Sequence, residues 1–259
     1  MILEKQKQEI YQKNVLITDS IDYAKTIQEA ILPDDEKLTA LFPDYFILYK
    51  PKATVSGDFY WVAKKENELI CAVADCTGHG VPGAFMSLLG HNMLENVVSR
   101  EGVVDPGSIL TALNEEIVAH FSKNHQTTKH GMDIAIVSIN SSSHTFQYAG
   151  AKNSVYLVRE NVLHELKADK FTIGKVMKDQ AFLSYTNHSQ PIQKMICSTC
   201  SPMVFRIKKV ELIRKRFFIN LSGICCSPLV CFLFRSRKFA WINSLPIGLV
   251  MVNKWMISL

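Results

Sequence analysis

Apolar side chains recur every seven residues in the first part of the chain, which contains neither proline nor glycine before Pro33. This spacing is typical of a coiled-coil seam, and it equally fits one amphipathic helix packed on its own domain. Pro33 and the acidic pair that follows it end the predicted helix. The repeating positions are Ile10, Ile17, Ala24 and Ile31, with Ile21 and the polar Asn14 and Gln28 in interleaved positions.

The pattern after Tyr45 predicts an α+β domain in which two helices stack on a sheet. Alternating or apolar runs predict strands over 45–49, 58–62, 68–74, 133–139, 145–148 and 154–158. The last three should form a meander, with Gly150 turning between the final two. Helices are predicted from Val81 to about Val98, opened by Pro82, and from Asp105-Pro106 to about Phe121.

Composition and charge change abruptly near residue 180. The 259 residues are 47% hydrophobic, enough to bury one substantial core. The net charge of +5 is uneven, because residues 180–259 carry eleven Lys and Arg against one acidic residue, and five of the seven cysteines. This basic excess lacks aromatic interleaving, so we expect no nucleic-acid partner. The charged first residues do not resemble a signal peptide, which predicts a cytoplasmic protein with reduced thiols.

Two aspartates at strand ends are the candidate catalytic and metal-binding residues. Asp58 follows Ser56-Gly57, and Asp75 opens a glycine-rich loop in which the backbone can approach a bound group. Carboxylates in such a place are hard-oxygen ligands for Mg²⁺ or Mn²⁺. An aspartate near glycine is also a common turn residue, so the residues alone leave both readings open.

Several motifs in order resemble the SpoIIE-type serine/threonine phosphatases of the protein phosphatase 2C (PPM) superfamily. Residues 20–33 resemble the linker helix that precedes the phosphatase domain. The two metal motifs of the family resemble the runs Val55-Ser56-Gly57-Asp58-Phe59-Tyr60-Trp61 and Ala74-Asp75-Cys76-Thr77-Gly78-His79-Gly80. Later blocks are similar at Gly131-Met132-Asp133, Tyr148-Ala149-Gly150-Ala151 and Ile173-Gly174-Lys175.

The resemblance implies a PPM-type α-β-β-α sandwich, incomplete at the C-terminus and preceded by the linker helix. It implies a site for two Mn²⁺ or Mg²⁺ ions, in which Asp75 bridges both ions, Asp58 holds one, and the backbone carbonyl of Cys76 is a weaker candidate ligand. The implied substrate is a phosphoserine or phosphothreonine protein, such as a partner-switching regulator. The seven-residue repeat adds the prediction of a homodimer through the N-terminal helix.

The chain also departs from this family, because two of its acidic motifs are missing. SpoIIE-type domains have an aspartate-glycine pair after an apolar strand and adjacent aspartates near the C-terminus. Here no aspartate follows Asp179, and Glu211 is the only later acid. Two carboxylates cannot easily hold two dications that each take about six oxygen ligands.

The missing acids appear when the coding sequence is read in another frame, in which each codon begins at the third base of a codon of the printed sequence. The last base of the Met195 codon and the first two of any isoleucine codon give GAT, an aspartate. Permitted codons up to Phe205 continue as Met-Phe-Tyr-Leu-Phe-Ser-Asp-Gly-Phe, in which Met203-Val204 forces the glycine. Trp255-Met256-Ile257 likewise forces GAT-GAT, two adjacent aspartates. We therefore infer a frameshift near residues 193–195.

The predicted organisation is a linker helix over 1–33, a partial phosphatase domain over 44–192, and a tail over 193–259 that is out of frame. The apolar run 217–234 is flanked by basic residues and has nearly the length of a membrane span, but we interpret it as a product of shifted codons. Cys197 and Cys200 have half the pattern of a zinc site and lack a second pair.

Two classes of function fit these observations. The first is a metal-dependent phosphoprotein phosphatase, impaired in this chain by its missing acids. The second is a non-catalytic remnant that dimerises or binds a regulator. The motifs at Asp58 and Asp75 favour the first class, and the missing acids favour the second.

Overall fold

The computed structural model describes residues 2–42, 45–49, 51–122, 131–159, 162–174, 183–192, 204–207, 230–231 and 251–252. Its helical elements are α1 (Ile2–Ile31), α2 (Asp35–Leu41), α3 (Val81–Glu95), the π-helical turn η1 (Asn96–Arg100) and α4 (Pro106–Ser122). Its strands are β1 (Tyr45–Leu48), β2 (Asp58–Lys65), β3 (Glu68–Cys76), β4 (Met132–Asn140), β5 (Thr145–Ala151), β6 (Val155–Arg159), β7 (Val162–Leu166), β8 (His188–Pro191), β9 (Val204–Ile207), β10 (Val230–Cys231) and β11 (Met251–Val252).

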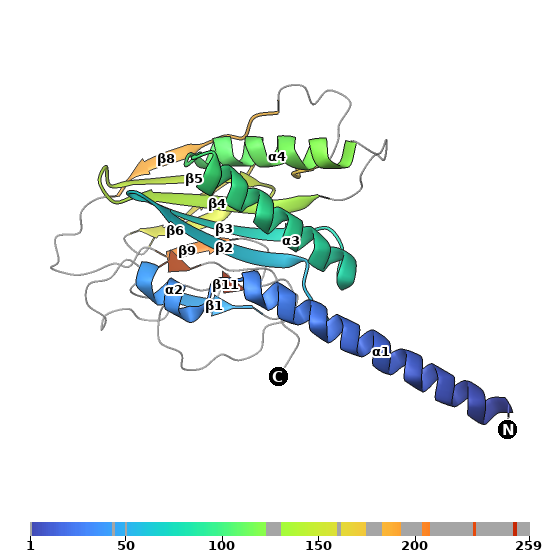
Figure 1. Cartoon of the computed structure of the whole chain (residues 1–259). Coiled ribbons are helices and arrows are strands. Elements are labelled where there is room, and N and C mark those ends of the chain that lie inside the picture. The colour runs from blue at the N-terminus through green and yellow to red at the C-terminus, as the bar shows by residue number, and fades with distance from the viewer. Residues whose placement is uncertain are drawn as a thin grey trace.

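A five-stranded antiparallel sheet in the order β2-β3-β4-β5-β8 forms the centre of the domain. Its three longest pairings join consecutive strands, although α3, η1 and α4 lie in the chain between β3 and β4 (Figure 1). A smaller antiparallel sheet has the order β7-β6-β9. The short strand β1 pairs in parallel with β10 and β11. The architecture is therefore a mixed helix and antiparallel-sheet sandwich.

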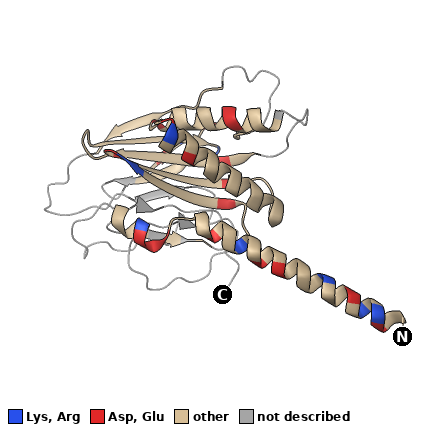
Figure 2. Ribbon diagram, in the orientation of Figure 1, with Lys and Arg blue, Asp and Glu red and all other residues tan. Residues whose placement is uncertain are grey.

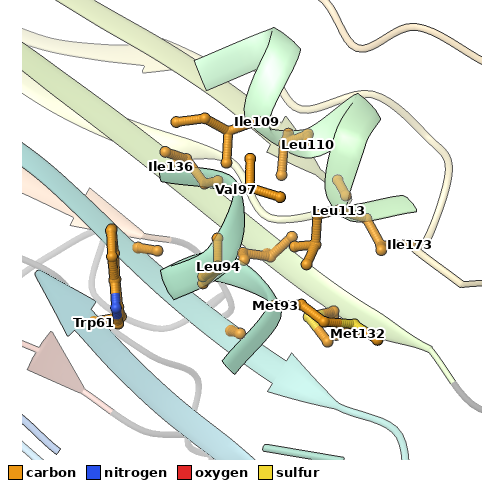
Figure 3. Close-up of a cluster of buried hydrophobic side chains, with 14 of the residues drawn as sticks. Trp61, Met93, Leu94, Val97, Ile109, Leu110, Leu113, Met132, Ile136 and Ile173 are labelled. Atoms are coloured by element: carbon orange, nitrogen blue, oxygen red, sulfur yellow. The ribbon is translucent and has the colours of Figure 1, made fainter. Parts of the chain in front are cut away.

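Helices α3 and α4 cover one face of the five-stranded sheet (Figure 1). Figure 3 shows side chains from both helices and from the sheet pointing toward one another in a continuous apolar core. Leu94, Val97, Ile109, Leu110 and Leu113 are fully buried in it. Burying apolar side chains of this size contributes about 1.5 to 3 kcal/mol each, so this helix layer is a main source of stability.

The opposite face of the five-stranded sheet packs against the smaller sheet and α2. Val73, Val137 and Tyr148 of the first sheet share a buried cluster with Val155 and Leu157 of the second. Side chains of a strand alternate between faces, so every second residue of β2, β3 and β4 points into this space between the sheets. Any polar residue with the same parity must lie there too.

Helix α1 extends away from the domain, and only its C-terminal end lies against the sandwich (Figure 1). Charged residues of both signs are spread along it (Figure 2). Of the predicted seam, Ile10 and Ile17 are exposed, whereas Ala24 and Ile31 are partly buried. The two interpretations left open by the sequence therefore apply to different parts of the helix: its end packs on the domain, and its first turns are uncovered.

The predicted α+β class and the two stacked helices are confirmed, and the first helix ends at Ile31, just before Pro33. The turn assigned to Gly150 is wrong, because Gly150 lies inside β5 and the chain turns at Lys152, which has a φ of 55°. A Cβ on Gly150 would collide with the Tyr148 hydroxyl, so close packing is the reason for this glycine. The predicted meander is also wrong at its last strand, since β6 pairs with β7 in the smaller sheet.

Among the described residues, no helix is long and apolar enough to cross a membrane. Cys197, Cys200 and the inferred frameshift position lie outside the described residues, and so does the run 217–234 except for residues 230–231.

Candidate functional site

Three aspartates form a row across the ends of the central strands. Asp58 on β2 is directly opposite Asp75 on β3, and Asp75 is directly opposite Asp133 on β4. Residues that face each other across an antiparallel pair project from the same side of the sheet, with Cβ atoms about 5 Å apart. All three share the parity of Val62, Val73 and Ala135, which are buried between the sheets. The aspartates therefore lie on the inner face, at one end of the sandwich.

The row concentrates negative charge in a partly shielded place. Asp58 is 7% exposed, and Asp75 and Asp133 are half-buried. Burial, and then the charges of Asp58, Asp75 and Asp133, raise the pKa of the neighbouring Cys76 thiol well above its usual value. Like charges that face each other across strands repel. This arrangement therefore favours a bound cation.

Close contact between backbone segments holds the two aspartate-bearing segments together. The Cys76 amide donates to the Gly57 carbonyl at 3.2 Å. A Cβ on Gly57 would lie 3.0 Å from the Gly78 carbonyl oxygen, and a Cβ on Gly83 would lie 3.0 Å from the Gly57 Cα and the Gly78 oxygen. Gly78 also has a φ of 104°, which L side chains rarely adopt. Glycine is thus required where the strand end, the loop and the start of α3 meet.

One backbone and one side-chain hydrogen bond connect this loop to Gly131, directly before β4. The Thr77 amide donates to the Gly131 carbonyl at 2.8 Å, and the Gly131 amide donates to Thr77 Oγ1 at 2.8 Å. Thr172 Oγ1 donates to Asp133 Oδ1 at 2.9 Å. The loop after Asp75 and the strand that carries Asp133 are therefore fixed relative to each other.

Tyr49 fixes the other side of the row. Its hydroxyl donates to the Asp58 carbonyl at 3.1 Å, and its ring meets Tyr60 edge-on with centroids 5.8 Å apart. Burial raises the pKa of Tyr49, a hydrogen bond with Ser56 lowers it, and the Asp58 charge raises it further. Tyr49 is thus a neutral hydrogen-bond donor that holds the start of β2.

The donors suit a divalent cation in kind but not in number. Carboxylate oxygens are the ligands that Mg²⁺ and Mn²⁺ prefer. Within the described part of the chain, no group of three or more His, Cys, Asp or Glu side chains is arranged to hold a metal ion. The reason is geometric, since Asp58 and Asp133 lie two strand spacings apart, roughly 10 Å, on opposite sides of Asp75. These residues therefore do not form a complete metal site.

The structure brings the two predicted carboxylates, Asp58 and Asp75, together as neighbours. The Cys76 side chain is buried on the helix-facing side of the sheet, and its role as a carbonyl ligand stays a prediction. Sequence reasoning assigned no role to Asp133, although Gly131-Met132-Asp133 was one of the matched blocks. An aspartate at the start of an apolar strand was the available signal. Its alignment with Asp75 depends on strand register and needed the structure.

Comparison with known proteins gives consistent matches. The sequence profile described as Stage II sporulation protein E (SpoIIE) matches residues 65–199. The SiaA-PP2C domain of Pseudomonas aeruginosa is 33% identical with a TM-score of 0.61, covering 70% of this chain and 69% of that one. This match confirms the predicted PPM-type fold class.

Two further proteins are similar over shorter shares. RsbU of Bacillus subtilis (strain 168), named a phosphoserine phosphatase, is 25% identical over 180 residues, which cover 66% of this chain and 50% of RsbU. The chain thus spans about half the length of that relative. The structure of RsbX in complex with magnesium is 24% identical with a TM-score of 0.43, covering 57% of this chain and 66% of that one.

We expect Gly83→Ala to destabilise the protein by about 1 to 3 kcal/mol, because the added Cβ overpacks the contact with Gly57 and Gly78. Helix propensity alone predicts the opposite sign, since alanine is favoured over glycine in helices by about 1 kcal/mol. Urea unfolding measures the difference. Gly90→Ala is the matched control, because its Cβ would meet the flexible Met132 methyl group and the Phe59 ring, which are side chains, whereas a Cβ on Gly83 meets backbone, and we expect a smaller loss. A Gly83→Ala variant as stable as the wild type would contradict the close-contact account.

Proposed function

Because the chain belongs to the SpoIIE family, we propose that it is a protein phosphatase domain that hydrolyses phosphoserine or phosphothreonine in a regulatory protein. The observation that carries the proposal is the row of Asp58, Asp75 and Asp133 at one end of the sandwich. The identity to the SiaA-PP2C domain and the name of RsbU support the same reaction class.

The proposed reaction requires Mn²⁺ or Mg²⁺. Such an ion, when bound, polarises phosphoryl oxygens and lowers the pKa of a bound water. Asp75 has a carboxylate on each side, and in this proposal it shares a cation with Asp58. Gly57, Gly78 and Gly83 keep side chains out of the adjoining backbone contact, and Tyr49 fixes the start of the Asp58 strand. These residues position the carboxylates, and the donor set is still too small.

The chain as written is impaired, because the rest of the metal site lies in the shifted register. The described carboxylates cannot complete a site, and the sequence after Asp179 offers only Glu211. The forced aspartates and glycine of the shifted reading supply the kind of donors that are missing. Restoring the reading frame of the gene near the codon of residue 194 is therefore expected to restore the site.

The partner proposed for this site is a phosphorylated regulator of the partner-switching type, in the cytoplasm. A second copy of the chain is the partner proposed for α1. Its exposed turns carry Ile10 and Ile17, two large apolar side chains of the seven-residue pattern. Pairing would cover these side chains and couple an upstream sensor to the domain.

A second candidate function is a non-catalytic remnant that keeps α1 and binds a copy of itself or a regulator. The incomplete donor set in the described part of the chain favours it. The two candidates differ in whether any metal-dependent hydrolysis remains.

We expect any phosphatase activity to need Mn²⁺ or Mg²⁺ and to fall at least about 100-fold in Asp75→Asn, because changing a residue that only hydrogen-bonds to a metal ligand can already cost about 10- to 100-fold in metal affinity or activity. Release of phosphate from a phosphoserine peptide, with and without chelator, measures this in the chain as written and in the corrected chain. Asp19→Asn, the same change at an exposed position of α1, should have no effect. Activity that survives chelation would remove the metal proposal.

Correcting the reading frame near the codon of residue 194 should raise both the thermal stability of the protein and its Mn²⁺-dependent hydrolysis. Without cations, Asp58 and Asp75 repel, and within its described residues the tail contributes only the short strands β9, β10 and β11. A net stability of about 5 to 15 kcal/mol is smaller than the burial contributed by several strands. Thermal melts and hydrolysis of the two versions decide this. Equal melting and equal turnover in both would show that the frameshift has no functional consequence.

The chain should dimerise through α1 at tens of micromolar. Light scattering of the full chain and of a version without residues 1–32 measures the mass of each. A double change of Ile10 and Ile17 to Ser should lower the dimer fraction, while changing exposed Lys5 and Gln12, which lie outside the seam, to Ser should not. A monomer that is unaffected by the deletion would contradict the pairing.

A further inference from the structure

Helix α1 buries one side chain fully, and that side chain is polar. Gln28 is 3% exposed, and it is the only residue of the helix that is buried rather than partly buried or exposed. Its Nε2 donates to the Ser56 carbonyl at 2.6 Å and to Ser87 Oγ at 2.7 Å, and its Oε1 accepts from the Ser56 amide at 2.9 Å. Both amide protons and the amide oxygen are therefore used.

The Gln28 amide holds the Ser56 residue as a neighbouring strand would, with one bond to its N–H and one to its C=O. Ser56 lies two residues before Asp58, and Ser56 Oγ accepts from the Asp58 amide at 3.0 Å. Ser56 thus links the two: its backbone is hydrogen-bonded to Gln28 of α1, and its side chain is hydrogen-bonded to the Asp58 amide. Each of these groups is buried.

Gln28 also reaches α3, the helix that begins after the Asp75 loop. Ser87 Oγ accepts from Gln28 and lies within hydrogen-bond distance of the Ala84 carbonyl (2.8 Å) and of the Ser56 carbonyl (3.3 Å). One side chain of α1 therefore contacts both segments that flank the row of aspartates. Removing it would leave the Ser56 amide, a buried donor, without this acceptor.

We propose that Gln28 is a positioning residue for Asp58, so that the placement of α1 on the domain sets the geometry of the Ser56-Gly57-Asp58 segment. Only the C-terminal end of α1 contacts the domain, and the exposed turns of the helix extend away from the domain (Figure 1). A shift or rotation of α1 would break the amide bonds to Ser56 and release the start of β2. The consequence for catalysis rests on the proposed function, whereas the structural link does not.

Hydrogen–deuterium exchange of the full chain tests the link without any need for hydrolysis. We expect Gln28→Leu, which keeps the size of the side chain, to speed exchange of the Ser56 and Asp58 amides about tenfold or more, because the buried Ser56 amide loses its acceptor. Amides of Ile70 to Val73 in the centre of β3 should keep their protection. Gln12→Leu, the same change on an exposed turn of α1, should change neither set.

Gln28→Glu gives a second test through its pH profile. A protonated glutamic acid can donate to the Ser56 carbonyl and accept from the Ser56 amide, whereas the carboxylate faces the carbonyl without a proton. Burial raises the pKa of such a carboxyl above its ordinary value of about 4.3. Protection of the two amides should therefore be present at low pH and be lost as pH rises through that raised pKa.

Tyr49, which hydrogen-bonds with Ser56, and the carboxyl groups of Asp58 and Glu29 near it are further titratable groups in this region. The wild type, measured over the same pH range, is the control for their contribution. A uniform rise in exchange over Ser56, Asp58 and the β3 amides in Gln28→Leu would overturn the proposal in favour of a general stabilising role. So would a Gln28→Glu variant whose protection matches the wild type at every pH. Failure of the phosphatase assays would leave these exchange results unaffected, so the two proposals fail separately.

Discussion

The antiparallel register of β2, β3 and β4 is the constraint on which the rest of the site depends. It places Asp58, Asp75 and Asp133 opposite one another, and the alternation of side chains turns all three toward the space between the sheets. A slip by one residue would move them to the helix-covered face. The buried residues between the sheets fix that register, so the hydrophobic core decides where the carboxylates lie.

This arrangement is electrostatically unfavourable by itself. Three carboxylates in a row, one of them almost fully buried, repel one another unless a cation lies among them. The glycines at 57, 78 and 83 and the hydrogen bonds of Thr77 and Tyr49 hold the carboxylates in place against that repulsion. Such a preorganised cluster is expected of a metal-dependent site, and the lack of further donors in the described part of the chain is why we propose impairment.

The link between α1 and the site gives the N-terminal helix more than one role. Its exposed turns carry the apolar repeat proposed to pair with a second copy, and its last turns carry the amide that holds Ser56. A signal that changes the pairing of α1 could thus reach Asp58 through a few hydrogen bonds. In the sequence, Gln28 looked like a polar residue in a seam, because a repeat cannot show which turns of a helix leave the domain.

The sequence by itself determined the fold class, the family resemblance, the positions of most helices and strands, and the two carboxylates at strand ends. These follow from local periodicity and from motifs a few residues long. Tertiary structure decided what depends on residues distant in the chain. It placed β6 in the second sheet, assigned Gly150 to close packing against Tyr148, aligned Asp133 with Asp75, and buried Gln28 against Ser56. Cross-strand register and the docking of a helix arise from packing between distant segments, which no local pattern specifies.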